Sequence, residues 1–116
     1  MQTNFAFLSA APKPSVAPDA LLARVTSEGQ AVAIAIKSAR LKQAYVAAAL
    51  GISGPYLSLI RHDKRPMPDA LVLPLCYLTR TLLVQQYRDL HAALDAIKGR
   101  TANAVEAMAA QLRSAA

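Results

Sequence analysis

The sequence has little of what builds disulfide frameworks, metal clusters and aromatic cores. It contains one cysteine, Cys76, and no tryptophan, and aromatic residues make up 5% of its 116 residues. A single cysteine excludes an intrachain disulfide and a thiolate metal cluster. The apolar neighbours of Cys76, Leu75 and Leu78 among them, predict a buried thiol rather than a redox sensor. The core must therefore be aliphatic.

Glycine and long apolar runs are also scarce. The chain has four glycines, and much of its 54% hydrophobic content is alanine, a composition that favours helix over sheet. No apolar run reaches the roughly 18 residues of a membrane span, and the N-terminus lacks the basic segment of a signal peptide. We expect an all-α, cytoplasmic protein with no membrane partner, built as one domain with a modest core.

Acidic residues are outnumbered by basic ones, and the excess is uneven. The net charge is +6 and the isoelectric point about 9.9. Residues 28–68 hold six basic and two acidic residues, a net charge of +4, whereas residues 1–27 and 69–116 each carry +1. This distribution suits an anionic partner that binds the middle of the chain.

Residues 43–62, in the middle of this basic region, read as two short helices joined by a tight turn. Val46, Ala47 and Leu50 lie at helical spacing and give the first helix one apolar face. Gly51 ends that helix, because glycine takes a positive φ without steric cost. Ala47 is small where the two helices should cross.

The second helix of this pair has its own start signals. Ser53 is a good N-cap, and Pro55 fits in the first turn, where no backbone donor is missed. Leu57 and Ile60, three residues apart, form its inward face, and Ile52 in the turn should pack on the core.

The order of these residues resembles the helix-turn-helix of the phage lambda repressor and Cro family, also called the xenobiotic-response-element family. The close match covers residues 43–62, and a looser one runs from about residue 27 to 77. The chain departs from the family at Lys42, where threonine often caps the first helix, and at Asp63, where glycine is common. The alternative is a helical hairpin that serves only for packing. The residues that carry the resemblance are Gln43, Val46, Ala47, Leu50, Gly51, Ile52, Ser53, Leu57, Ser58 and Ile60.

The resemblance implies that Gln43 and positions 54, 55 and 58 face double-stranded DNA. The second helix is poor in the Arg, Asn and Gln side chains that make bidentate base contacts. We therefore expect basic side chains after it to hold phosphates, and DNA shape to add specificity. Tyr56 either bonds a phosphate or packs as a half-buried ring, and His62 is expected to be a solvated loop residue. The predicted DNA-contacting residues are Gln43, Ser53, Gly54, Pro55, Tyr56, Ser58, Leu59, Arg61, His62, Lys64 and Arg65, with Arg61, Lys64 and Arg65 as phosphate clamps.

Residues 1–18 contain three prolines among small residues and predict a mobile arm. Phe5, Phe7 and Leu8 within it either dock on the body or on a protein partner, or are incidental apolar residues of a disordered tail.

Residues 19–80 should form the DNA-binding domain. Pro74 predicts a kink or break near Leu73 in the last helix of this domain. Besides the pair described above, the expected helices are residues 20–25 capped by Asp19, residues 27–40 begun by Ser27 and Glu28, and residues 70–79 capped by Asp69.

Residues 81–116 should form two further helices. The first runs from Thr81 to Lys98 and ends at Gly99, and Thr101 caps the second. These helices either pack on their own domain or, as we favour, form a homodimer contact. The predicted seam, spaced 4, 3, 4 and 3 residues apart, is Leu83, Tyr87, Leu90, Leu94 and Ile97.

Together these features predict a sequence-specific DNA-binding transcriptional regulator, a repressor that binds a two-fold operator as a homodimer. The alternative is an antitoxin that neutralises a partner protein and binds its own promoter. Two histidines 29 positions apart without nearby acidic ligands make no metal site, and no glycine-rich phosphate loop is present. We expect no enzymatic activity and no cofactor.

Overall fold

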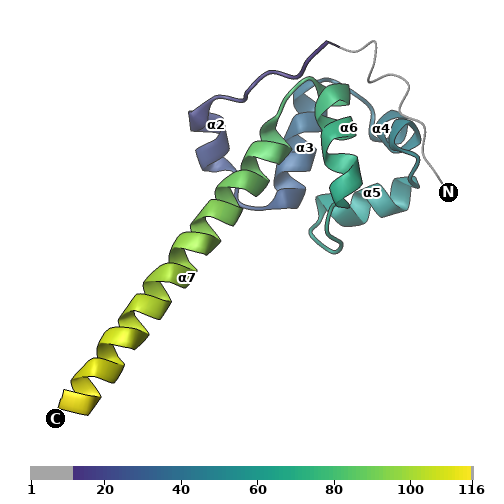
Figure 1. The fold of residues 1–116 in the computed structure, drawn as a ribbon. Helices are drawn as coiled ribbons and strands as arrows, with labels where there is room; N and C mark the ends of the chain where they lie inside the picture. Colours follow the sequence, from purple (N-terminus) through teal and green to yellow (C-terminus); the bar gives the residue numbers. More distant parts are fainter. Residues whose placement is uncertain (1–11, 116) are drawn as a thin grey trace.

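The computed structural model describes residues 12–115, and these are predominantly helical (Figure 1). The arm residues Phe5, Phe7 and Leu8 lie outside the described residues. The helices are α2 (Asp19–Arg24), α3 (Glu28–Ser38), α4 (Gln43–Leu50), α5 (Gly54–Arg61), α6 (Asp69–Thr79) and α7 (Leu83–Ala115).

Helix α3 is central to the body, where it contacts α5, α6 and the beginning of α7. Its Ala31 and Val32 are fully buried, and the largest buried side chains of the neighbouring helices are aliphatic, as the composition predicted. The largest fully buried side chains include Leu50, Leu57, Ile60, Leu75 and Leu83.

The predicted helix signals of the central region are confirmed. The Ser27 hydroxyl accepts from the backbone N–H of Gln30, and the Ser53 hydroxyl accepts from that of Tyr56, each at 3.1 Å. Gly51 adopts φ 74° and ψ 26°, the left-handed conformation expected at the turn. Helix α5 is then turned by 107° relative to α4.

Two predicted N-caps are wrong by one residue. Asp19 and Asp69 are the first residues of α2 and α6, and the N-cap positions belong to Pro18 and Pro68, which make no side-chain cap bond. The N-cap residue takes an extended conformation, which the fixed φ of proline already provides.

The expected break near Leu73 is absent, because α6 continues through Pro74. Proline removes one backbone donor, and the buried ring of Pro74 packs within the body. Packing therefore holds the helix together across the missing hydrogen bond.

The segment before α2 is attached to the body rather than mobile over its described part. The Ser15 N–H donates to the Arg80 carbonyl at 3.1 Å, and the Leu82 N–H donates to the Ser15 carbonyl at 2.9 Å. The Gln86 side chain bonds both the N–H and the carbonyl of Ala17, at 2.7 and 3.1 Å. The arm prediction is therefore wrong for these residues.

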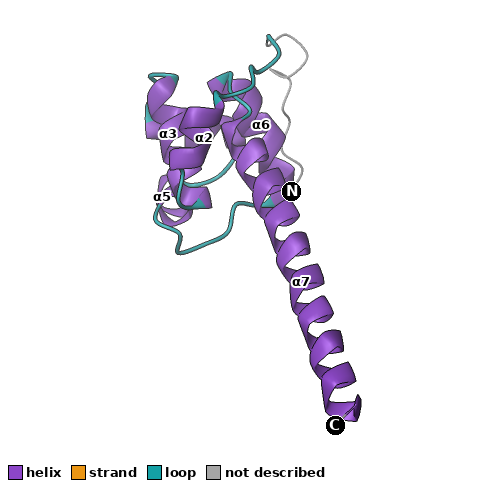
Figure 2. Cartoon of the chain, turned by 90° about the vertical axis from the view of Figure 1, so that its left-hand side faces the viewer, coloured by secondary structure: helices purple, strands orange, loops and turns teal. Residues whose placement is uncertain are grey.

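The C-terminal region is one helix of 33 residues, not two. Gly99 does not end it, and Thr101 caps nothing: its hydroxyl donates to the Ile97 carbonyl at 3.0 Å, within the helix. One glycine costs a helix about 1 kcal/mol, and the alanine-rich sequence around it favours propagation. Figures 1 and 2 show α7 leaving the body as a lone rod, which gives the molecule its 65 × 30 × 24 Å extents.

The predicted seam on α7 is divided between two environments. Leu83 and Tyr87 are 1% and 8% exposed and belong to the domain's own core, which corrects their placement in a dimer contact. They are buried because α2, α3 and α6 all pack on the first turns of α7. Leu90, Leu94 and Ile97 lie beyond the body and are exposed.

Within residues 12–115, none of the helices taken alone has the length and apolar character of a membrane span. Only α4 and α5 counted together reach that composition.

Candidate nucleic-acid interface

Helix α5 has one face in the core and one face in solvent. Leu57 and Ile60 point inward and are buried. Pro55, Leu59 and His62 are exposed on the outer side, where Leu59 is 40% exposed. The predicted reading surface is therefore open to solvent at these three positions, whereas Gly54, Tyr56 and Ser58 are half-buried.

The first turn of α5 is shaped by its cap. The Ser53 hydroxyl, although exposed, accepts from the Tyr56 N–H, so it serves as the N-cap of α5. The ring of Tyr56 is half-buried and packs against the core, which is the packing alternative considered for this residue. Nothing lies within 4 Å of a β-carbon built on Gly54, so a DNA strand can approach the backbone there.

Gln43 and Arg61 are brought together from the start of α4 and the end of α5. The Nη1 of Arg61 donates to the Gln43 side-chain oxygen. Arg61 is half-buried, and its Nε is buried without a partner. The two residues predicted as separate DNA contacts thus form one unit, and the Arg61 guanidinium is partly committed inside the protein.

The loop after α5 carries one acidic and two basic side chains, Asp63, Lys64 and Arg65. Asp63 takes φ 59°, and its Oδ1 accepts from the Gly29 N–H at 2.8 Å, so the carboxylate caps the start of α3. Lys64 and Arg65 are exposed, and both of their backbone N–H groups donate to the Leu59 carbonyl, at 2.9 and 3.3 Å. All three side chains are exposed, but one oxygen of the acid is bonded to the body, whereas the two cations point to solvent.

His62 closes α5 at the C-cap position. Its Nδ1 lies 2.8 Å from the Ser58 carbonyl and donates to it, because a carbonyl only accepts. The imidazole is exposed, as expected for a solvated residue. Ser58 itself is half-buried on α5.

Gly29 was not recognised from the sequence. A β-carbon at Gly29 would lie 2.6 Å from the carbonyl oxygens of both Ile60 and Arg61 and 2.7 Å from Oδ1 of Asp63. Helix α3 therefore approaches the end of α5 to backbone contact. This contact fixes where the loop of residues 62–68, here called the basic loop, leaves α5.

Arg88 was also missed, and it ties α7 to the body. Its Nη2 bonds Glu28 at 2.8 Å and the Met67 carbonyl, and its Nη1 bonds Asp69 at 2.5 Å. Glu28 in turn accepts from the Met67 N–H at 3.1 Å. Burial alone would lower the pKa of Arg88, but the hydrogen bonds and charges of the two carboxylates outweigh it and raise that pKa.

A hollow of about 290 Å³ lies between the start of α3 and the basic loop. Lys64 and Arg65 line it, but so do Glu28 and Asp63. The two carboxylates make its interior unsuitable for a phosphate.

The remaining chemistry-bearing groups are few. Cys76 is buried, as predicted, and burial raises the pKa of its thiol. Over the described part of the chain, no three His, Cys, Asp or Glu side chains are grouped to hold a metal ion.

Comparison with models of known protein families, with curated proteins and with solved structures gives no match, so the assignment of function depends on the geometry described above.

Proposed function

We propose that this protein is a sequence-specific DNA-binding transcriptional regulator, a repressor that acts by occupying a two-fold operator. The observation that carries the proposal is the α4–α5 pair, whose outer face is exposed and is followed by the outward-facing cations Lys64 and Arg65. The 107° turn between the two helices is within the range of DNA-binding helix-turn-helix pairs.

In this proposal α5 lies in the major groove with its first turn toward the base edges. Pro55 and Leu59 offer apolar contact to thymine methyl groups, and Ser58 offers a hydroxyl to a base or a phosphate. Because no residue on this face makes a bidentate base contact, a large part of the specificity comes from DNA shape.

Affinity comes from phosphate contacts on the flank of α5. Lys64 and Arg65 neutralise phosphates without reading sequence. Gln43 contacts Arg61 at the end of α5, and the residue before Gln43 is the exposed Lys42. Lys42 therefore adds positive charge near the end of α5. Arg61 acts mainly by holding Gln43 in position.

The experiment is a nuclease footprint on the DNA upstream of the protein's own gene. We expect two protected half-sites related by a two-fold axis. The double variant Pro55→Ala with Ser58→Ala should lose this footprint while keeping weak, uniform binding, because the phosphate contacts remain. Uniform coating of the DNA by the unchanged protein, with no protected half-sites, would refute the proposal.

A second candidate is an antitoxin that neutralises a partner protein and regulates its own promoter. The exposed apolar residues of α7 favour it, since they offer a surface for another protein. A small toxin encoded beside the gene, which binds the chain and loses its activity, would establish it.

A further inference from the structure

The exposed part of α7 carries one continuous apolar line, here called the α7 stripe. Its residues follow an 11-residue repeat, in which Leu90, Leu94 and Ile97 recur as Thr101, Val105 and Met108. At 100° per residue the set falls within about 80° of arc, and no charged residue lies in that arc. The α7 stripe consists of Leu90, Leu94, Ile97, Thr101, Val105, Met108 and Leu112.

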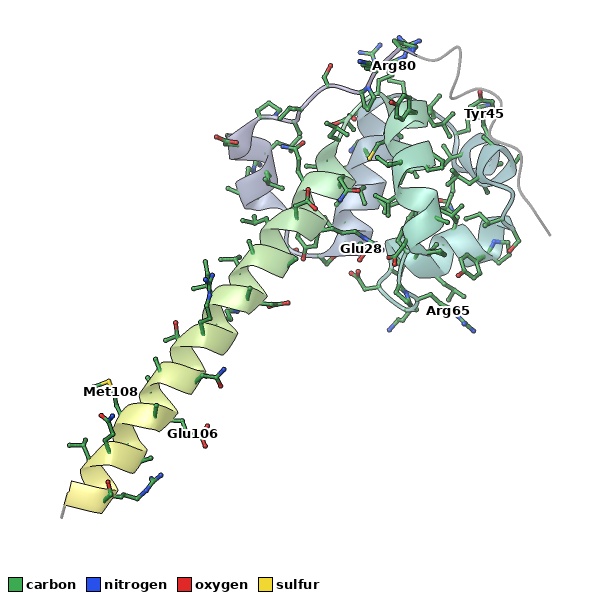
Figure 3. The ribbon with its side chains drawn as sticks, viewed as in Figure 1. Glu28, Tyr45, Arg65, Arg80, Glu106 and Met108 are labelled. Carbon is green, nitrogen blue, oxygen red and sulfur yellow. The ribbon has the colours of Figure 1, made fainter. Side chains whose placement is uncertain are left out.

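The α7 stripe is exposed along its whole length. Exposure rises from 38% at Leu90 to 63% at Met108 and 72% at Leu112. Figure 3 shows Met108 and Glu106 projecting to opposite sides of α7, so the apolar and charged sides are distinct there. An isolated helix with a glycine in its middle is only marginally stable in water, and a contiguous apolar surface marks a contact site.

A second copy of α7 meets the requirements for the occupant. Residues 89–115 carry three acidic and three basic residues, so two copies approach without net repulsion. At roughly 60–100 Å² of apolar surface per side chain, two α7 stripes remove on the order of 1,000 Å² from water, which is about the smallest area of a specific interface. The Thr101 hydroxyl is bonded to its own Ile97 carbonyl and brings no unmet donor into the contact.

The body decides the direction of pairing. Leu83 and Tyr87 fall in the same arc as the α7 stripe but are buried against their own domain, and α2 contacts α7 at this level (Figure 1). In a parallel pair, the first turns of each α7 would occupy the space of the other copy's body. An antiparallel pair places the bodies at opposite ends and avoids this collision.

The spacing of the α7 stripe permits that antiparallel pairing. Successive members lie 4, 3, 4, 4, 3 and 4 residues apart, and this series reads the same in both directions. With Thr101 opposite its own copy, Leu90 meets Leu112, Leu94 meets Met108 and Ile97 meets Val105. Every apolar residue then has an apolar partner.

We propose that two copies of this chain associate through an antiparallel pair of α7 helices centred on Thr101. An 11-residue repeat, at 3.67 residues per turn, keeps the contact nearly straight with a slight right-handed twist. The two Arg88 residues, where each α7 leaves its body, are then about 39 Å apart along the axis, at 1.5 Å per residue. This arrangement specifies the homodimer of the proposed function, but it can be tested without DNA.

The first test is sedimentation of the full chain without DNA. We expect a dimer at micromolar concentration that Leu94→Asp converts to a monomer. Ala92→Asp is the matched control, because it places the same charge on the exposed opposite side of the helix and should leave the dimer intact. Protection of the buried Cys76 thiol from alkylation reports that each variant keeps its fold. A wild-type monomer, or a dimer equally sensitive to both substitutions, would overturn the proposal.

The second test fixes the direction by disulfide formation in a Cys76→Ala background. Thr101→Cys should cross-link with itself. Leu94→Cys should not cross-link with itself but should do so when mixed with Met108→Cys. Self-cross-linking of Leu94→Cys, or no cross-link in the mixture, would rule out the antiparallel arrangement. If the dimer and the cross-links are found as expected but the wild-type protein does not bind DNA, the proposed function is refuted and the antiparallel dimer stands.

Discussion

Gly29 lies where the first turn of α3 meets the last turn of α5. A β-carbon there would lie 2.6 Å from two backbone carbonyls, which cannot move aside as a flexible side chain does. Gly29→Ala should therefore lower the free energy of unfolding by about 1–3 kcal/mol, the usual cost of overpacking. Urea denaturation measures it, with Gly54→Ala as the control, because nothing lies within 4 Å of that β-carbon. Equal midpoints would contradict the close approach.

The buried thiol of Cys76 should make the free energy of unfolding depend on pH. Burial raises the pKa of its thiol, so the folded state favours the neutral form. Its contribution to stability is fully present below the unfolded pKa of about 8.5 and is lost as pH rises through the folded pKa. The stability difference between the wild type and Cys76→Ala should shrink from pH 7 to pH 10, as urea titrations at each pH would show. A difference that grows with pH would show that the thiolate is favoured instead.

Sequence reasoning succeeded at residues whose partners are near in the chain. Ser27, Gly51 and Ser53 act within three or four positions, so local patterns identify them. Gly29 and Arg88 act on partners 34 and 60 residues away, at Asp63 and Glu28, and no local pattern shows this. For the same reason the local pattern marks Asp63 only as a departure at a glycine position, although its carboxylate caps α3.

The start of α7 is held to α3 and α6 by Arg88. Its side chain is 23% exposed and that of Glu28 is 28% exposed, whereas Asp69 is 98% exposed. Arg88→Met should cost roughly 2–3 kcal/mol, since it leaves the half-buried Glu28 with one fewer partner and the Met67 carbonyl unbonded. Asp69→Asn should cost less than about 1 kcal/mol, because exposed ion pairs contribute little. Chemical denaturation measures the free energy of unfolding of both variants. A larger loss for Asp69→Asn than for Arg88→Met would contradict the role given to Arg88.

The continuity of α7 through Gly99 was the largest departure from the sequence prediction. Gly99 taken alone predicts the end of a helix, but the residues on both sides are good helix formers, and neither proline nor a capping bond opposes propagation. A local signal such as one glycine marks a possible end of a helix. The summed helix propensity of the surrounding residues decides whether the helix ends there.

That continuity is testable by breaking the helix. Gly99→Pro should remove helical signal in circular dichroism and abolish dimerisation, because proline breaks a helix interior. The unfolding midpoint of the body should stay unchanged, as it shares no contact with this part of α7. Gly99→Ala is the control and should raise the helical signal. A dimer that survives Gly99→Pro would show that the α7 stripe is not the contact.

At the scale of the whole molecule, charge and apolar surface are separated. The net charge of residues 28–68 is +4, whereas residues 89–115 are neutral and carry the α7 stripe. The body supplies the proposed DNA contacts and the rod supplies the proposed dimer contact. The composition indicated this division. The direction in which two α7 helices pair, however, depends on how the body packs around Leu83 and Tyr87, and sequence spacing does not show that packing.

The most direct test of the central claim is the salt dependence of binding to duplex DNA. The logarithm of the binding constant should fall linearly with the logarithm of salt concentration, and Lys64→Gln and Arg65→Gln should each reduce the slope by about 1. Arg80→Gln removes the same charge from the opposite end of the body (Figure 3) and should leave the slope unchanged. Binding that does not depend on salt, or equal slopes for Arg65→Gln and Arg80→Gln, would contradict a DNA-binding surface at α5 and its basic loop.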